Sequence, residues 1–187
     1  EHFGQWSEPE VSEGHTSLIG AHIGGRYTIT ELLGRGGMGT VYAAHQASVD
    51  RSVAIKVLNR EFAENASIVR RFHQEAMAAS RLSHPNTISI YDFGQSDGLL
   101  YIAMERLRGE TLKAVIDEVG LVSPRRALKI LKQVLSSVAE AHRKGVIHRD
   151  LKPENIFLTH PDASQDFVTV LDFGVARLRR HDDTQAT

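Results

Sequence analysis

The sequence predicts an α+β fold in two lobes, with a complete, sheet-based small lobe followed by a partial, mainly helical large lobe. Five segments with strand character and one helical segment fill the first part of the chain, and helices with short strands follow. The composition is that of a globular protein, with 41% hydrophobic and 24% charged residues. We expect the small lobe at residues 26–107 and the large lobe at residues 108–187.

Residues 1–25 precede the first regular segment. Gly, Ser, Glu and His dominate them, and neither a strand period nor a helix period persists. We therefore expect a flexible leader or linker. The alternative is a docking segment around Trp6, which the composition does not favour.

The small lobe is predicted to contain five strands and one helix. Residues 27–33 alternate and are rich in β-branched and aromatic residues, as a strand should be. Residues 66–82 have apolar side chains at helical spacing, and Pro85 interrupts that pattern. A Ser-Asp-Gly turn joins the last two strands as a hairpin. The remaining strands are expected at residues 40–44, 52–58, 87–93 and 99–106.

The large lobe is predicted to begin with a helix. Ser123 is a suitable N-cap, Pro124 suits the first helical position, and Gly145 follows the helix end. Its expected apolar face consists of Leu128, Leu131, Val134, Leu135 and Val138. Short apolar strands are expected at residues 146–147, 156–158 and 168–171.

The charge balance and the absence of cysteine exclude several classes of protein. Lys and Arg total 22 and Asp and Glu total 23, so neither a nucleic-acid footprint nor a basic membrane patch is indicated. Without cysteine there are no disulfides or thiolate metal sites. No apolar run approaches the ~20 residues that span a bilayer, and we expect no secretory leader. We expect a cytoplasmic chain.

The glycine-rich segment Gly34–Val41 has the pattern G-x-G-x-x-G-x-V. Glycines let a backbone approach closely enough to direct N–H groups at phosphate oxygens. A nicotinamide-binding turn shares the glycine triplet but opens a helix, whereas residues 40–42 have strand character. This motif alone leaves open a glycine-rich hairpin without a ligand.

Lys56 ends the apolar strand segment VAIK. A surface lysine on an edge strand is the plain interpretation. Beside a phosphate-binding loop, however, the ammonium group could pair with phosphates, and a carboxylate would have to hold it in place. Glu75 on the following helix is the candidate, although by itself it would be an ordinary solvated helix residue.

The segment His148–Asn155, HRDLKPEN, crowds polar residues between two apolar segments. Asp150 can accept a hydroxyl proton, and Lys152 can neutralise a transferring phosphoryl group. Asn155 offers a hard oxygen to Mg²⁺. A chance occurrence of this octapeptide is negligible.

The tripeptide Asp172-Phe173-Gly174 follows a predicted strand. A carboxylate at a strand end is a good Mg²⁺ ligand, and the glycine lets the chain turn sharply. The tripeptide means little alone, but it completes the set of motifs.

The motifs GRGGMGTV, VAIK, HRDLKPEN and DFG stand in the order of the eukaryotic-type protein kinase family. The chain resembles the bacterial serine/threonine branch of that family over about residues 26–180. The resemblance implies a protein kinase fold and transfer of the ATP γ-phosphoryl group to protein Ser/Thr hydroxyls, because tyrosine kinases usually lack a lysine at Lys152. The alternative is an ATP-binding, pseudokinase-like scaffold, although pseudokinases usually lose residues of the type of Lys56, Asp150 or Asp172.

The resemblance also implies residue roles. Lys56 would hold the ATP phosphates and pair with Glu75, and Asp150 would deprotonate the substrate hydroxyl. Asn155 and Asp172 would bind Mg²⁺, which Mn²⁺ can replace. The expected ATP contacts, with Met104 as gatekeeper, are Leu33, Gly34, Arg35, Gly36, Gly37, Met38, Gly39, Thr40, Val41, Ala54, Lys56, Met104, Glu105, Leu107 and Phe157.

The resemblance further implies a regulatory spine in which His148 and Phe173 stack with Ala79 and Ile90. Ala79 is small for such a position, so we expect loose packing there. Arg149 implies control through a phosphorylated activation loop. Candidate phosphosites are Thr184 and Thr187, with ordinary loop threonines as the alternative.

The resemblance stops soon after the DFG motif, because the chain ends at Thr187 without an A-P-E motif or later helices. We therefore expect a fragment with little or no transfer activity by itself. The apolar face of its long helix would lack cover, which favours aggregation or a partner surface. Its protein substrate and its oligomeric state stay open, and a longer parent could be membrane-tethered.

Overall fold

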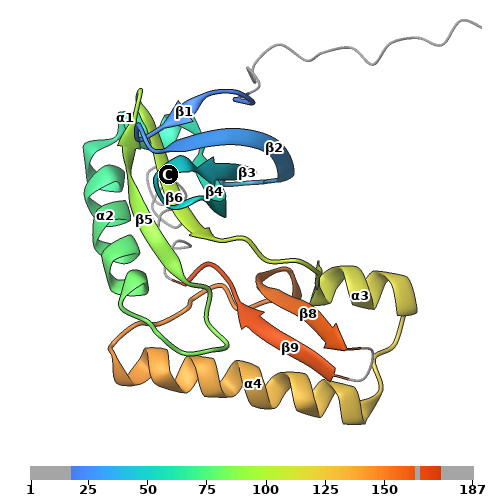
Figure 1. Cartoon of the computed structure of the whole chain (residues 1–187). Coiled ribbons are helices and arrows are strands. Elements are labelled where there is room, and N and C mark those ends of the chain that lie inside the picture. The colour runs from blue at the N-terminus through green and yellow to red at the C-terminus, as the bar shows by residue number, and fades with distance from the viewer. Residues whose placement is uncertain (1–17, 163–164, 174–187) are drawn as a thin grey trace, which may run out of the picture.

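The computed structural model describes residues 18–162 and 165–173, arranged as two lobes (Figure 1). This confirms the predicted two-lobed α+β fold. The strands are β1 (His22–Ile23), β2 (Tyr27–Gly36), β3 (Gly39–Gln46), β4 (Arg51–Leu58), β5 (Ile90–Ser96), β6 (Leu99–Glu105), β7 (Glu110–Thr111), β8 (Ile156–Asp162) and β9 (Gln165–Val170). The helices are α1 (Arg60–Glu64), α2 (Ala66–Ser80), α3 (Leu112–Val119) and α4 (Pro124–Arg143), with 3-10 turns at Ala47–Val49 and Pro153–Asn155.

The small lobe differs from the prediction in the number of its elements. Its sheet has six strands in the order β1-β2-β3-β4-β6-β5, and two helices accompany it rather than one. The predicted leader at residues 1–25 is too long, because His22–Ile23 pairs with β2. A two-residue strand and a five-residue helix are too short to show a period in the sequence.

Some predictions fall on parts of the chain that the structure does not describe. The segment around Trp6 and the candidate phosphosites Thr184 and Thr187 lie outside the described residues. Within those residues, no helix combines the length and the apolar character that crossing a membrane requires.

Strand β4 lies inside the small-lobe sheet and is buried at six consecutive residues, 53–58. Ile55 points to a cluster with Tyr27 on one face, whereas Leu58 packs with Phe72 of α2 on the other. Side chains alternate between the two faces of a strand. Lys56 therefore shares the helix-covered face with Leu58, and the lysine is only 8% exposed.

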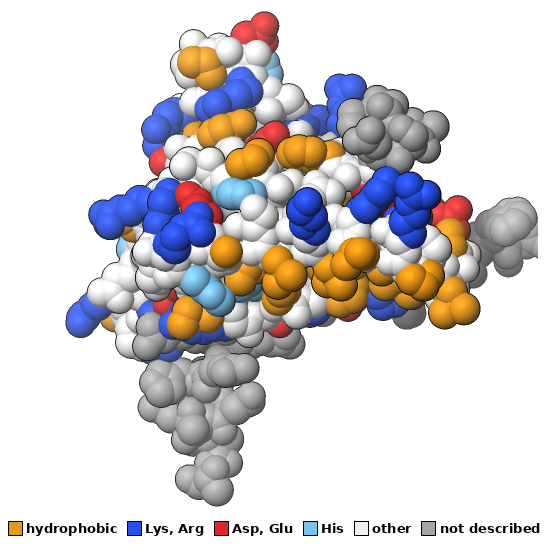
Figure 2. Space-filling model, turned by 90° about the horizontal axis from the view of Figure 1, so that it is seen from below, with side chains coloured by type: hydrophobic (Ala, Val, Ile, Leu, Met, Phe, Trp, Pro, Cys, Tyr) orange, Lys and Arg blue, Asp and Glu red, His pale blue; other side chains and the backbone are white. Residues whose placement is uncertain are grey.

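The large lobe packs one side of α4 against the sheet β7-β8-β9. Ile130 and Val134 are buried in this core with Leu158 and Val168. The predicted apolar face of α4 is therefore divided: Val134 is buried and Val138 half-buried, whereas the other members are exposed. Those exposed members are Leu128 (70%), Leu131 (51%) and Leu135 (64%). Figure 2 shows apolar side chains gathered along the underside of the molecule.

The connection between α2 and β5 crosses to the large lobe. The strand predicted at residues 87–93 begins instead at Ile90. Before it, the Ile88 N–H donates to the Val170 carbonyl at 3.0 Å, and the Val170 N–H donates to the Asn86 carbonyl at 2.8 Å. The prediction was wrong here because β9, distant in sequence, takes these backbone groups.

Candidate active site

A cavity of about 550 Å³ lies between the lobes. The loop from β2 to β3 forms one wall, and the loop that precedes β8 forms another. The predicted site residues that line it are residues 34–39, Val41, Lys56, Asp150, Lys152, Asn155 and Asp172. The fold thus brings together four motifs that are far apart in the sequence.

The glycine-rich segment forms a tight hairpin, in which Gly36 pairs with Gly39 across a two-residue turn. Gly39 has a φ of 156°, and a Cβ there would lie 2.1 Å from the Val57 carbonyl oxygen. This oxygen belongs to the backbone of strand β4, inside the sheet, so it cannot move aside without disturbing the strand. Glycine at position 39 is therefore required by the fold itself.

Lys56 is one of the cationic side chains that line the cavity. Its Nζ lies 2.6 Å from Oδ2 of Asp172, so the predicted pairing with Glu75 is wrong in this structure. Glu75 instead forms an ion pair with Arg149, with 3.4 Å between Nη1 and Oε1. The physical reason is that a second cation, brought by the loop before β8, competes for the glutamate.

Asp150 has its carboxylate in contact with two donors. Oδ2 accepts hydrogen bonds from Lys152 Nζ at 2.9 Å and from Asn155 Nδ2 at 3.1 Å. Burial alone would raise the pKa of Asp150, but the bond and charge of Lys152, with help from Asn155, outweigh it and lower the pKa. Asp150 is therefore ionised at neutral pH and can accept a proton.

His148 connects the loop before β8 to the chain that carries Asp172. Its Nε2 donates to the Leu171 carbonyl at 2.7 Å, and its Nδ1 accepts from the Asp150 N–H at 3.3 Å. Burial lowers the pKa of His148 by more than the Leu171 bond and the nearby carboxylates raise it. Both hydrogen bonds suit the neutral Nε2–H tautomer.

Asn155 and Asp172 both line the cavity, and their side-chain oxygens are hard atoms that could bind a divalent cation. Asn155 Nδ2 donates to both the backbone and the side chain of Asp150, and within the described residues no hydrogen bond reaches its Oδ1. Those residues also contain no cluster of three or more His, Cys or acidic side chains suited to a metal. The pair fits Mg²⁺, which uses one or two protein ligands and completes its shell with phosphates and water.

Two site residues have left-handed backbone conformations, Arg149 with a φ of 66° and Asp172 with a φ of 57°. Aspartate enters this region fairly readily, whereas arginine does so less often. Such conformations cost on the order of 1–3 kcal/mol and cluster at functional sites. The strain at Arg149 therefore supports assigning function to this loop.

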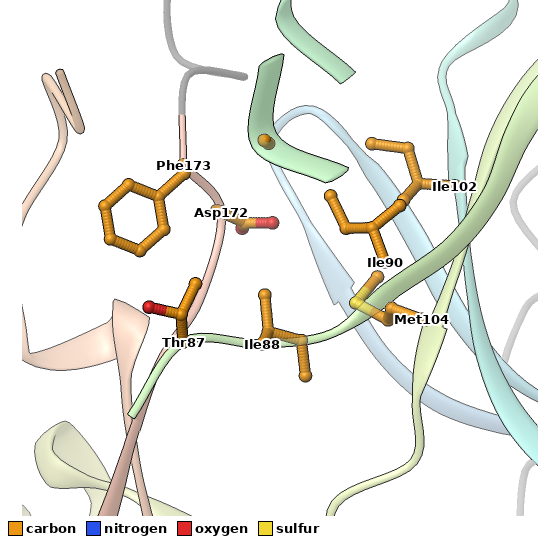
Figure 3. A pocket seen from close by; sticks show the side chains of 8 residues that line it. Thr87, Ile88, Ile90, Ile102, Met104, Asp172 and Phe173 are labelled. Atoms are coloured by element: carbon orange, nitrogen blue, oxygen red, sulfur yellow. The ribbon is translucent and has the colours of Figure 1, made fainter. Parts of the chain in front are cut away.

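Of the ATP contacts that the resemblance places around adenine, Val41 lines the main cavity and the others do not. Met104 lines a separate cavity of about 10 Å³ beside Asp172 and Phe173 (Figure 3). Glu105 and Leu107 line a groove near Phe167. The main cavity also lacks the other predicted contacts Leu33, Thr40, Ala54 and Phe157. The adenine contacts therefore stay a prediction.

The small cavity lies within the expected spine. The rings of His148 and Phe173 are 4.7 Å apart between centroids, and Ala79 and Ile90 pack in the same cluster as Phe173. A volume of about 10 Å³ is close to the minimum for one water molecule. This cavity beside Ala79 is consistent with the predicted loose packing.

Comparison with known proteins decides the family. The protein kinase domain profile matches residues 27–187. The chain belongs to the protein kinase domain family. This kinase chain is 45% identical to the serine/threonine-protein kinase PrkC of Bacillus subtilis (strain 168) over 159 residues, which are 85% of this chain and 24% of PrkC.

Two further comparisons agree with this assignment. The kinase chain is 47% identical to serine/threonine-protein kinase pkn3 of Myxococcus xanthus over 161 residues, covering 86% of this chain and 29% of pkn3. The crystal structure of the Mycobacterium tuberculosis PknI kinase domain matches with a TM-score of 0.76 and 33% identity, over 86% of this chain and 64% of that one. The chain thus spans under a third of these two curated relatives.

Two features of the kinase site had no signal in the sequence. Thr111 lines the cavity, although locally it is only the N-cap of α3, where its Oγ1 accepts from the Ala114 N–H at 3.1 Å. Arg149 was expected to serve a phosphorylated loop, and its contact with Glu75 was not foreseen. Both depend on how separate segments meet in space.

Proposed function

We propose that this chain forms the nucleotide-binding and phosphoryl-transfer part of a serine/threonine protein kinase. Its reaction would move the γ-phosphoryl group of ATP to a Ser or Thr hydroxyl of a protein. The observation that carries the proposal is that Asp150, Asn155 and Asp172 line one cavity with Lys56 and the glycine hairpin. The names of the relatives PrkC and pkn3 support the same activity.

In the proposed reaction, the substrate hydroxyl lies beside Asp150, whose ionised carboxylate takes its proton. The hydroxyl oxygen then bonds to the γ-phosphorus, while the bond from that phosphorus to the β,γ-bridging oxygen breaks and ADP leaves. Lys152, 2.9 Å from Asp150, would neutralise charge on the transferring group. Positioning and charge neutralisation supply most of the catalysis in such reactions.

The phosphates would lie between the glycine hairpin and Lys56. To reach them, Lys56 exchanges its 2.6 Å contact with Asp172 for phosphate oxygens. Asp172 and Asn155 would hold Mg²⁺, which when bound would neutralise negative charge on the phosphates. The backbone N–H groups of the hairpin orient the remaining phosphate oxygens.

Nucleotide binding tests the first half of the proposal. We expect Mg-ATP to raise the melting temperature of the chain. At a hundredfold excess over the dissociation constant, binding should add about 2.7 kcal/mol to the free energy of unfolding. NAD should give no such effect. Stabilisation by NAD and not by Mg-ATP would overturn the assignment.

Phosphoryl transfer by the full-length protein tests the second half. Asp150→Asn should lower kcat by about 10²–10⁴-fold, the usual contribution of a general base, and should leave Mg-ATP affinity unchanged. Radiolabel transfer to a Ser/Thr protein substrate measures the rate. A wild-type protein that binds Mg-ATP but never transfers phosphate would indicate the scaffold alternative instead.

A further inference from the structure

Among the described strands, β9 lies at the edge of the large-lobe sheet and has β8 as its one neighbour. An edge strand presents N–H and C=O groups that need other partners. Along β9, two side-chain amides from different elements supply them. Asn86 comes from the α2–β5 connection, and Gln133 comes from α4.

Gln133 bonds to the first part of this edge. Its Nε2 donates to the Asp166 carbonyl at 3.0 Å, and its Oε1 accepts from the Val168 N–H at 3.0 Å. Asn86 continues the series, because its Nδ2 donates to the Val168 carbonyl at 2.7 Å and to Gln133 Oε1 at 3.1 Å. The two amides thus bond to β9 and to each other.

The backbone beside Asn86 extends this pairing to the end of β9. The Val170 N–H donates to the Asn86 carbonyl at 2.8 Å, the Ile88 N–H donates to the Val170 carbonyl at 3.0 Å, and Thr87 forms a parallel bridge with Val170. Val170 is the last residue of β9 and stands two positions before Asp172. Asn86 therefore acts on the segment that carries the proposed metal ligand.

The other side of that segment is also held. The Leu171 N–H donates to the Asn155 carbonyl at 2.9 Å, and the Leu171 carbonyl accepts from His148. The direction in which the chain leaves β9 is therefore set from two sides. The loop before β8, with His148 and Asn155, sets one side, and the connection containing Asn86 sets the other.

We propose that Asn86 is a positioning residue for Asp172: by completing the edge of β9, it holds the Asp172 carboxylate where a nucleotide-bound divalent cation requires it. This inference rests on the proposed function. Asn86 is 8% exposed, and its loss would leave the Val168 carbonyl without its 2.7 Å donor. Partners that orient a metal ligand typically contribute 10–100-fold to metal affinity.

Thr87 is a matched control. Its Oγ1 is 2.7 Å from Ser137 Oγ, and both residues are buried. Thr87→Val removes a buried hydrogen bond between the same connection and the large lobe, but this bond does not reach β9. A purely structural role for Asn86 predicts that the two variants behave alike.

The experiment measures affinities of the whole chain for adenosine, for ATP with EDTA and for Mg-ATP, by calorimetry well below the melting temperature. Asn86→Ala should weaken Mg-ATP binding about tenfold and leave adenosine and metal-free ATP unchanged. Thr87→Val should lower the melting temperature and leave all three affinities unchanged. Equal weakening of all three ligands by Asn86→Ala, or no weakening, would overturn the inference.

Two further outcomes keep the test decisive. If Asn86→Ala does not fold, Gln133→Met, which keeps the length of the stem but loses both amide bonds to β9, should show the same loss confined to Mg-ATP. Unchanged Mg-ATP affinity in that variant would also overturn the inference. A wild-type chain that binds none of the three ligands would overturn the proposed function itself and this inference with it.

Discussion

At the residue scale, the site is organised around the buried cation Lys56. A buried charge is tolerated only when an opposite charge compensates it, and Asp172 does so at 2.6 Å. We have proposed the same two side chains as the partners of the ATP phosphates and of Mg²⁺. Their ion pair therefore keeps the two groups close together. On ligand binding, the phosphates would replace Asp172 as the partner of Lys56, and Mg²⁺ would replace Lys56 as the partner of Asp172.

Gly39 offers a direct test of steric fit at the glycine hairpin. Gly39→Ala should lower the free energy of unfolding by about 1–3 kcal/mol, because the new Cβ would meet the Val57 carbonyl oxygen at 2.1 Å. Urea denaturation measures the change. The control is Gly34→Ala, since a Cβ at Gly34 meets nothing within 4 Å; equal losses in the two variants would contradict the prediction.

His148 should make stability depend on pH. Its pKa in the folded chain is lowered, mainly by burial, so between that value and about 6.5 the unfolded chain binds more protons. The contribution of neutral His148 to the free energy of unfolding is therefore complete above about pH 6.5. It is lost as the pH falls toward the pKa of His148 in the folded chain.

Thermal unfolding at pH 5.5 and 7.5 measures this dependence. His148→Phe should unfold with a smaller difference between the two pH values than the wild type. The variant also loses the hydrogen bond to Leu171, and the difference between wild type and variant at pH 7.5 measures the effect of that loss. Identical differences in the two proteins would show that His148 is not the titrating group.

At the element scale, α2 depends on the cap at its N-terminus. The Asn65 side chain accepts from the N–H groups of Ser67 and Ile68 at 2.9 and 3.3 Å. Asn65→Ala should therefore cost about 1 kcal/mol of unfolding free energy. This helix carries Glu75 and Ala79, so its stability also affects the site.

Asn59 is the matched control for this prediction. It occupies the N-cap of α1, but its side chain makes no capping hydrogen bond. Asn59→Ala should change the free energy of unfolding by less than Asn65→Ala in chemical denaturation. A larger loss at Asn59 would contradict the assignment of the cap.

At the scale of the whole molecule, α4 has one covered face and one uncovered face. Leu128, Leu131 and Leu135 are all more than half exposed, and Figure 2 shows apolar side chains gathered along this side. Contiguous exposed apolar surface promotes association. We therefore expect this chain to self-associate in solution.

Replacing the three exposed leucines with glutamine should reduce that association. The mean mass from light scattering should fall toward that of one chain, 20.7 kDa, with little change in melting temperature. Ile130→Gln is the contrasting variant, because this buried side chain belongs to the core and its replacement should destabilise the fold. An unchanged mass in the triple variant would show that α4 is not the associating surface.

The sequence by itself determined the order of the main strands and helices and the identity of the chemical groups. Hydrophobic periods located β2, α2 and α4 because each is long enough to show its period, and β4 was located by its short apolar run. The motifs located Asp150 and Asp172 because particular residue types at particular spacings are rare by chance. The short elements β1 and α1 did not appear, since a few residues cannot display a period.

Only the tertiary structure decided which of these groups meet. It paired Lys56 with Asp172 and placed Arg149 beside Glu75, although the motifs had suggested the pair Lys56–Glu75. It also placed Asn86 beside β9, 82 residues away from its partner Val168 in the sequence. The physical reason is that a side chain's partner is chosen by distance and competition among all nearby charges and donors, and local sequence does not record these.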